Sequence, residues 1–253
     1  MPIFIYKSEK IFYETYGSGP LLILHHGFGS DKSSWIKYNW INSLTKDFKI
    51  LIFDALGHGS SNKPHNSTKY TIEEMAKLSL NLAKNLDYEK FGFLGFSLGG
   101  RVGFEIAENY SKYLNFLVIG GMHHKPPSVN KDIYERNIFI LKSKKGNFVT
   151  KGNLHRPSND PLALAASYEA MLMWKGISND KIKFDFPILM FCGEKDKYYN
   201  DVRLFAKEKK IKFIAIPKAN HFGSLQSSSE AFIHINNFMI DNKLEEKKWK
   251  KNA

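Results

Sequence analysis

The sequence predicts an α/β fold, with a mostly parallel and doubly wound sheet of about eight strands and a helical cap insertion. Short apolar runs alternate along the chain with longer segments of helical periodicity, which is typical of parallel strands joined by crossover helices. The chain has 253 residues, of which 43% are hydrophobic and 14% aromatic, and this is enough to bury a substantial core. Because no internal repeat or low-complexity linker interrupts it, we expect a single domain.

The strands are expected at two kinds of apolar run. Near the N-terminus, the segments "IFIYK" and "IFYETYG" are typical of a hairpin of antiparallel edge strands. Six further runs have the length and composition of buried parallel strands. These six runs cover residues 21–26, 49–54, 91–96, 114–121, 187–193 and 212–217.

Two helices have clear signatures between and after these runs. Thr71 and Glu74 form a T-x-x-E capping box at the start of a helix whose apolar side chains repeat on one face as far as Leu86. Near the C-terminus, Phe232 and Ile235 begin the same helical spacing. We expect this last helix to pack on the sheet.

Residues 122–185 do not continue the alternation of strand-like and helix-like segments. They contain two helical patterns, near 131–142 and 161–174, with no convincing strand between them. We therefore predict a core of residues 1–121 and 186–253, with 122–185 as a cap inserted above the sheet. Met and aromatic side chains in the cap suit an adaptable pocket wall, although a plain helix core would use them equally. They are Tyr134, Phe139, Tyr168, Met171, Met173 and Trp174.

Charge and cysteine content limit the partners and the compartment. The net charge is +12, but the lysines are scattered and accompany no recognisable nucleic-acid module, so we predict no nucleic-acid partner. The Lys-rich segment "EEKKWKKNA" at 245–253 is expected to be a solvated, frayed tail. No signal peptide and no membrane-spanning run is present, and the single Cys192 excludes an internal disulfide, so we expect a cytoplasmic protein without a membrane partner.

The segment "FLGFSLGG", residues 93–100, places Ser97 between an apolar run and the start of a helix. A sharp strand-to-helix turn would bring strand and helix close together, and Gly95 and Gly99 leave room for that approach. The turn also leaves the Leu98 N–H at the helix start, where an oxyanion could accept a hydrogen bond. Ser97 is therefore either a nucleophile or a polar residue of a glycine-rich turn.

Four further motifs make the whole chain resemble an α/β-hydrolase. "HHGFGS" at 25–30 matches the family's H-G-x loop, and the resemblance implies that the Phe28 N–H is a second oxyanion donor. "FDALGHGSS" at 53–61 is similar to the family's D-x-x-G-x-G-x-S loop, in which Asp54 would serve loop structure. "GEKDKYY" at 193–199 and "ANHFG" at 219–223 match the positions of the acid and the base, which implies Asp196 and His221.

The predicted topology supports this mapping on independent grounds. Side chains that follow parallel strands meet at one edge of the sheet, which is where open α/β sheets bind their substrates. His221 would take the proton from Ser97 and return it to the leaving group, while Asp196 would fix the imidazole tautomer. Glu194 is the alternative acid if the register of its loop differs.

Other polar residues have roles nearer to structure. His26 is expected to pin the oxyanion loop, while His123 and Trp174 could contact substrate or stand behind the pocket wall. The histidines lack the helical spacing and carboxylate neighbours of a metal site, so we predict neither metal nor cofactor. Cys192 is expected to be a buried structural thiol, and Arg101 either anchors its helix or meets an anionic substrate.

These features predict a serine hydrolase that cleaves a small to medium carboxylic ester through an acyl-enzyme at Ser97. Cleavage of a thioester, a lactone or a carbon–carbon bond would use the same residues. A perhydrolase, a lyase or an acyltransferase could also be built on them. A ligand-binding receptor that retains the triad is the alternative from another class. An elbow aspartate would indicate a dehalogenase or an epoxide hydrolase, but the residue is serine. The sequence leaves the oligomeric state open.

Overall fold

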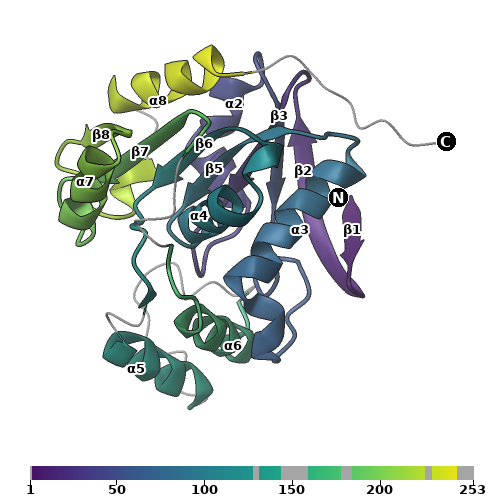
Figure 1. Ribbon diagram of the computed structural model, residues 1–253. Coiled ribbons are helices and arrows are strands. Elements are labelled where there is room, and N and C mark those ends of the chain that lie inside the picture. The colour runs from purple at the N-terminus through teal and green to yellow at the C-terminus, as the bar shows by residue number, and fades with distance from the viewer. Residues whose placement is uncertain (1, 128–130, 144–158, 178–183, 226–229, 244–253) are drawn as a thin grey trace.

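A single mixed sheet organises the computed structural model, which describes residues 2–127, 131–143, 159–177, 184–225 and 230–243 (Figure 1). Its eight strands lie in the order β1-β2-β4-β3-β5-β6-β7-β8. Their bounds are β1 Ile3–Tyr6, β2 Glu9–Tyr16, β3 Leu21–His25, β4 Lys49–Phe53, β5 Phe91–Phe96, β6 Leu114–Gly120, β7 Ile188–Gly193 and β8 Lys212–Ile216. The predicted fold class and every predicted strand are confirmed.

The strand directions follow the predicted pattern with one refinement. β1 pairs with β2, and β2 with β4, in antiparallel fashion, while β4, β3, β5, β6, β7 and β8 form a parallel array. The prediction that both hairpin strands lie at the edge is wrong for β2, because β2 is hydrogen-bonded on both sides. Only β1 closes that edge of the sheet.

Helices cover both faces of the sheet, so the fold is doubly wound. In β3, Leu21 and Ile23 enter one core cluster and Leu22 and Leu24 the other, as alternation along a strand requires. The first cluster includes side chains of α3 Ile72–Asn85, α4 Leu98–Asn109 and α7 Tyr199–Glu208. The second includes side chains of α1 Ser33–Lys37, α2 Trp40–Leu44 and α8 Glu230–Asp241. Figure 1 shows α3 and α4 in front of the sheet.

The start of α3 forms only half of the predicted capping box. Thr71 Oγ1 accepts a hydrogen bond from the Glu74 N–H at 3.1 Å, which satisfies one of the free donors at the helix start. The Glu74 carboxylate instead accepts from Lys7 Nζ at 2.6 Å and from the Tyr6 hydroxyl at 3.3 Å. This glutamate thus ties α3 to the edge hairpin.

The two helices expected within residues 122–185 are present as α5 Lys131–Lys142 and α6 Pro161–Leu172. They pack against each other at one end of the molecule, and α6 also contacts the short helix η1 Ser67–Tyr70 (Figure 1). The described residues between 122 and 185 form no strand. The division into core and cap at 121/122 and 185/186 stays a prediction, and the C-terminal 245–253 segment lies outside the described residues.

None of the helices in the described ranges is both long and apolar enough to cross a membrane.

Candidate active site

Ser97 lies in a strained turn between β5 and α4. Its backbone has φ 55° and ψ −108°, a conformation that L residues rarely adopt. An ideal Cβ on Gly95 would lie 2.0 Å from the carbonyl oxygen of Gly99, and one on Gly99 would lie 2.2 Å from that of His25. Only glycine fits at either position, so the sequence "GFSLG" forms the tight elbow that its spacing predicts.

Asp196 and His221 meet next to this turn, although 25 residues separate them in the chain. His221 Nδ1 donates a hydrogen bond to Asp196 Oδ2 at 2.6 Å, and the Tyr198 N–H donates to Asp196 Oδ1 at 3.0 Å. Burial raises the pKa of Asp196, but the hydrogen bond and charge of His221 outweigh it and leave the pKa below its ordinary value. The Asp196 carboxylate is therefore ionised at neutral pH and holds His221 with Nε2 directed away from it.

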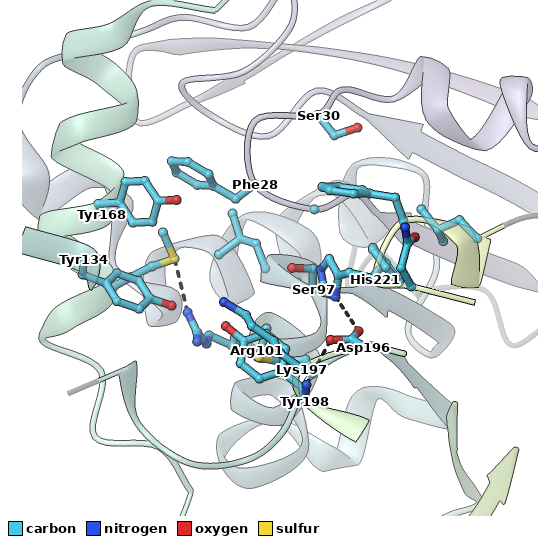
Figure 2. Close-up of a pocket in the computed structure, with 18 of the residues that line it drawn as sticks. Phe28, Ser30, Ser97, Arg101, Tyr134, Tyr168, Asp196, Lys197, Tyr198 and His221 are labelled. Atoms are coloured by element: carbon cyan, nitrogen blue, oxygen red, sulfur yellow. Dashed lines mark hydrogen bonds and ion pairs between the residues drawn. The ribbon is translucent and has the colours of Figure 1, made fainter. Parts of the chain in front are cut away.

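His221 lies on the Ser97 side of this pair. Its ring packs against Phe96 with centroids 5.0 Å apart, and its Cε1 would be 3.2 Å from a Cβ on Gly121. The Ser97 N–H donates to the Gly120 carbonyl at 2.9 Å. Ser97 and His221 therefore both lie at the carboxyl end of β6. Figure 2 shows Ser97, His221 and Asp196 along one side of the pocket. Ser97 Oγ makes no hydrogen bond to another described residue, which leaves the hydroxyl free for substrate.

Two backbone donors face the same region. Phe28 and Leu98 both line the pocket, and the loop that carries Phe28 approaches Ser97 so closely that a Cβ on Gly27 would lie 3.3 Å from Ser97 Cβ. Within the described ranges, neither the Phe28 nor the Leu98 N–H has a hydrogen-bond acceptor. Free N–H groups beside a nucleophile can stabilise a developing oxyanion, each by about 3 kcal/mol.

The pocket has a volume of about 500 Å³, within the range of small-molecule sites. Its far wall comes from α5 and α6, where Tyr134, Tyr168 and Met171 contribute side chains (Figure 2). The ring centroids of Phe28 and Tyr168 lie 4.1 Å apart, and this contact joins the loop that carries Phe28 to α6. Both the sheet edge and the predicted cap therefore shape the pocket.

Several aromatic and Met side chains of the predicted cap do not line it. Phe139 is 74% and Met173 52% exposed, so neither is a wall of this pocket. Trp174 is also outside the lining, because its indole Nε1 donates to Glu105 Oε2 at 3.0 Å. His123 is buried behind the pocket, with its ring 4.8 Å from that of Tyr198. Each was a pocket candidate, and the periodicity of a helix does not show which face meets a cavity.

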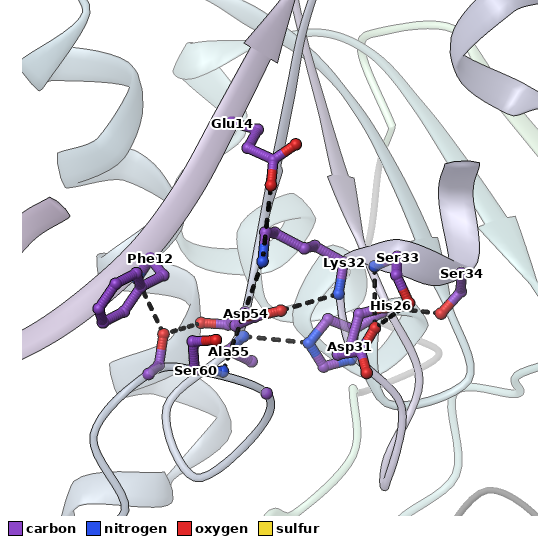
Figure 3. Close-up of polar contacts among 12 residues, drawn as sticks. Phe12, Glu14, His26, Asp31, Lys32, Ser33, Ser34, Asp54, Ala55 and Ser60 are labelled. Atoms are coloured by element: carbon purple, nitrogen blue, oxygen red, sulfur yellow. Dashed lines mark hydrogen bonds and ion pairs between the residues drawn. The ribbon is translucent and has the colours of Figure 1, made fainter. Parts of the chain in front are cut away.

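His26 and Asp54 hold the loops behind the site (Figure 3). His26 Nε2 accepts from the Ala55 N–H at 3.0 Å, and its Nδ1 lies 2.8 Å from the Gly27 carbonyl oxygen. Asp54 accepts from both the backbone N–H of Lys32 at 2.9 Å and its Nζ at 3.1 Å. The positions agree with the expectation that both residues position loops.

Sequence reasoning missed part of the lining. Lys195 and Lys197 flank Asp196 and line the pocket, as do Met122 after β6 and Asn220 before His221. All four are chain neighbours of strand ends or motif residues, and this adjacency was the signal that could have found them. Within the described residues, no group of three His, Cys, Asp or Glu side chains could hold a metal ion.

Comparison with known proteins identifies the family. A family model described as "alpha/beta hydrolase fold" matches residues 20–149, which is more than half of the chain. The chain belongs to the alpha/beta hydrolase family. The expected resemblance is confirmed, and with it the prediction that this alpha/beta hydrolase is an enzyme.

Individual relatives of this alpha/beta hydrolase differ in activity. A Bacillus subtilis protein provisionally named 2-succinyl-6-hydroxy-2,4-cyclohexadiene-1-carboxylate synthase is 22% identical, over 85% of this chain and 89% of the relative. A pimeloyl-[acyl-carrier protein] methyl ester esterase of Vibrio parahaemolyticus is 32% identical, over 44% of this chain and 40% of the relative. The solved enol-lactonase of Burkholderia xenovorans superposes with a TM-score of 0.76 at 18% identity, covering 95% of this chain and 99% of that one.

Proposed function

We propose that this alpha/beta hydrolase cleaves a small to medium carboxylic ester, with Ser97 as nucleophile, His221 as base and Asp196 as the orienting acid. The observation that carries the proposal is the placement of Ser97, in a strained turn with a free hydroxyl, at the pocket that also receives the hydrogen-bonded His221–Asp196 pair. No metal or organic cofactor takes part in the proposed reaction. A cytoplasmic location and the absence of a nucleic-acid partner stay predictions from the sequence.

The proposed reaction has two halves. Ser97 Oγ attacks the ester carbonyl carbon while His221 Nε2 accepts the hydroxyl proton, and the carbonyl oxygen becomes an oxyanion hydrogen-bonded to the Phe28 and Leu98 N–H groups. The C–O bond of the alcohol breaks, and His221 donates its proton to the leaving oxygen. Water then attacks the acyl-enzyme with His221 again as base, which releases the acid and restores Ser97.

Pocket size and relatives support the substrate class. A cavity of about 500 Å³ accommodates a small or medium ester, and its walls combine aromatic and Met side chains with a few polar groups. The names of the Vibrio and Burkholderia proteins include an ester and a lactone as substrates. Cleavage of thioesters, lactones or carbon–carbon bonds would use the same three side chains, so the assay must include these substrate classes.

The proposal is tested with a fluorophosphonate probe and a panel of 4-nitrophenyl esters, thioesters and lactones. We expect probe labelling and ester turnover by the wild-type protein, and a loss of at least about 1,000-fold in kcat/KM in Ser97→Ala. Ser111→Ala, at an exposed serine of the helix η2 Ser111–Tyr113, is the matched control and should behave as wild type. Equal labelling of wild type and Ser97→Ala would exclude Ser97 as the nucleophile.

A further inference from the structure

Arg101 lines the pocket one helical turn after Ser97, and its side chain is only 3% exposed. One guanidinium nitrogen lies 3.5 Å from the Met171 sulfur, and the group lies 5.6 Å from the Tyr134 ring centroid. Its Nε has no hydrogen-bond partner among the described residues. Figure 2 shows Arg101 between Tyr134 and the Ser97–His221 side of the pocket.

No described carboxylate neutralises this guanidinium. Glu105, one turn further along α4, already accepts hydrogen bonds from the Trp174 indole at 3.0 Å and from the Asn109 amide at 2.8 Å. Asp196 is bonded to His221 and to the Tyr198 N–H. A buried cation without a carboxylate partner is costly, so an anionic ligand that reached Arg101 would offset desolvation that its aromatic contacts offset only in part.

The rest of the pocket adds positive charge. Lys195 and Lys197 line it together with Arg101. Among the described lining residues Asp196 is the one acidic side chain, and its carboxylate already accepts a hydrogen bond from His221. Lys197 is exposed, and its Nζ lies 4.7 Å from the Tyr198 ring centroid. The charge balance of the pocket therefore favours an anionic ligand.

We propose that Arg101 binds a free carboxylate on the substrate, so that the preferred ester is a half-ester of a dicarboxylic acid. This inference rests on the proposed function and names its substrate class. A guanidinium offers two parallel N–H donors that match the two oxygens of a carboxylate. Because Arg101 follows Ser97 by four residues, or about 6 Å along the helix axis, the two ends of a short dicarboxylate can reach both residues.

A purely structural role for Arg101 makes a different prediction. Its contacts with Tyr134 and Trp174 are typical of a cation–π anchor between α4 and the cap. If anchoring were its only role, removing the charge would lower turnover of neutral and anionic esters by the same factor. The ratio of kcat/KM values for the two kinds of ester separates these roles.

The experiment compares mono-4-nitrophenyl succinate and glutarate with neutral 4-nitrophenyl butyrate. We expect wild type to prefer the anionic esters and Arg101→Met to lower the anionic-to-neutral ratio of kcat/KM by about 10- to 100-fold. Arg101→Lys, which keeps the charge but loses the fork, should give an intermediate ratio and guards against misfolding of the Met variant. Arg203→Met, at an exposed arginine of α7, is the matched control and should keep the wild-type ratio. An unchanged ratio in Arg101→Met would overturn the proposal.

A second measurement separates failure of this inference from failure of the proposed function. Binding of glutarate to Ser97→Ala, followed by calorimetry, needs no turnover. We expect binding that is weakened about 10-fold or more when Arg101→Met is added. If no ester is hydrolysed but this binding difference is found, the carboxylate site stands and the hydrolytic proposal fails. Equal binding by both proteins would refute the carboxylate site.

Discussion

Gly95 and Ser97 belong to one turn but place different demands on the backbone. Gly95 has no room for a Cβ, because the Gly99 carbonyl of α4 approaches to 2.0 Å from that position. Ser97 carries a Cβ at φ 55°, and such a conformation costs about 1–3 kcal/mol. The strain persists because β5 and α4 are packed on both sides of the turn, and it holds the hydroxyl at the pocket.

Gly95→Ala should therefore disrupt the elbow. We expect the free energy of unfolding to fall by at least about 2 kcal/mol, because strand and helix must separate to admit the methyl group. Gly103→Ala on the same helix is the matched control, since its Cβ would meet side-chain atoms at 3.0 Å or more, and should change stability by less than about 1 kcal/mol. Urea unfolding measures both, and similar losses in the two variants would contradict this account.

Asp196 and Glu194 give a second comparison at the residue scale. Asp196 is bonded to His221, whereas the exposed Glu194 accepts from the Lys218 N–H at 3.0 Å. Asp196→Asn should lower kcat by about 10,000-fold, because an amide favours the wrong imidazole tautomer. Glu194→Gln should leave kcat within about threefold of wild type. The reverse pattern in ester assays would make Glu194 the acid.

At the scale of elements, the ends of the helices position the pocket walls. α6 begins at Asp160, whose carboxylate accepts from the Leu162 and Ala163 N–H groups at 2.8 and 3.3 Å. Pro161 follows at the first helical position, where its missing N–H costs nothing. Asp160 also pairs with His65 at 2.9 Å, which ties α6 to the loop before η1. This start fixes the helix that presents Tyr168 and Met171.

Asp160→Ala should lower the free energy of unfolding by about 1 kcal/mol, the usual cost of losing an N-cap acceptor. Asp160→Asn keeps that acceptor and changes only the partly exposed contact with His65, so it should cost a few tenths of a kcal/mol. Urea unfolding at pH 7 compares the two. An asparagine variant as unstable as the alanine variant would show that the contact with His65 matters more than the cap.

Elements differ in how well the sequence predicts them, and the reason is physical. Five of the six parallel strands are almost wholly buried, so each is a continuous apolar run bounded by polar residues. The sixth, β8, lies at the edge of the sheet and is only partly buried, but its run is also mostly apolar, and all six were predicted. Helices α1 and α2 have five residues each, which is too short for a helical repeat of apolar residues to be recognised. Helix α7 was overlooked although Val202, Phe205 and Ala206 repeat at helical spacing.

The pocket was harder to predict than the strand ends. Helix α6 is apolar on nearly all sides, so its sequence does not show which face meets the cavity. The sequence therefore left Tyr168 and Met171 open between pocket wall and helix core, and they line the pocket. Trp174 follows α6 and lies outside the lining, which is one of the two places left open for it. The motif residues were predicted from the resemblance to the family and from topology, since the carboxyl ends of β5, β7 and β8 converge whatever the packing above them.

At the scale of the whole molecule, stability depends on histidines that the fold keeps neutral. His25 and His58 are both 0% exposed, and each donates a hydrogen bond from Nδ1 to one backbone carbonyl, while Nε2 has no partner among the described residues. Burial lowers the pKa of His25 to about 3 and that of His58 to about 4. The unfolded chain exposes the same imidazoles, which then titrate near pH 6.5.

This difference predicts acid destabilisation with a definite window. Between about pH 6.5 and pH 4 the unfolded state binds protons at His25 and His58 that the folded state does not, so stability falls as pH is lowered. Each site contributes a slope of up to about 1.4 kcal/mol per pH unit. The window lies above the ordinary pKa of aspartate, near 3.8, so loss of the Asp196 interaction adds to the fall only at lower pH.

His58→Phe removes one of these two titrating groups, and the phenyl ring fills the space of the buried imidazole. The slope of unfolding free energy against pH, measured by urea unfolding between pH 6.5 and 4.5, should then decrease by about 1 kcal/mol per pH unit whatever the variant's stability at pH 7. His234→Phe is the matched control, because His234 is exposed on α8 and is solvated alike in both states. An unaltered slope in His58→Phe would mean that the folded protein admits a proton to His58, and that water reaches the loops behind the pocket.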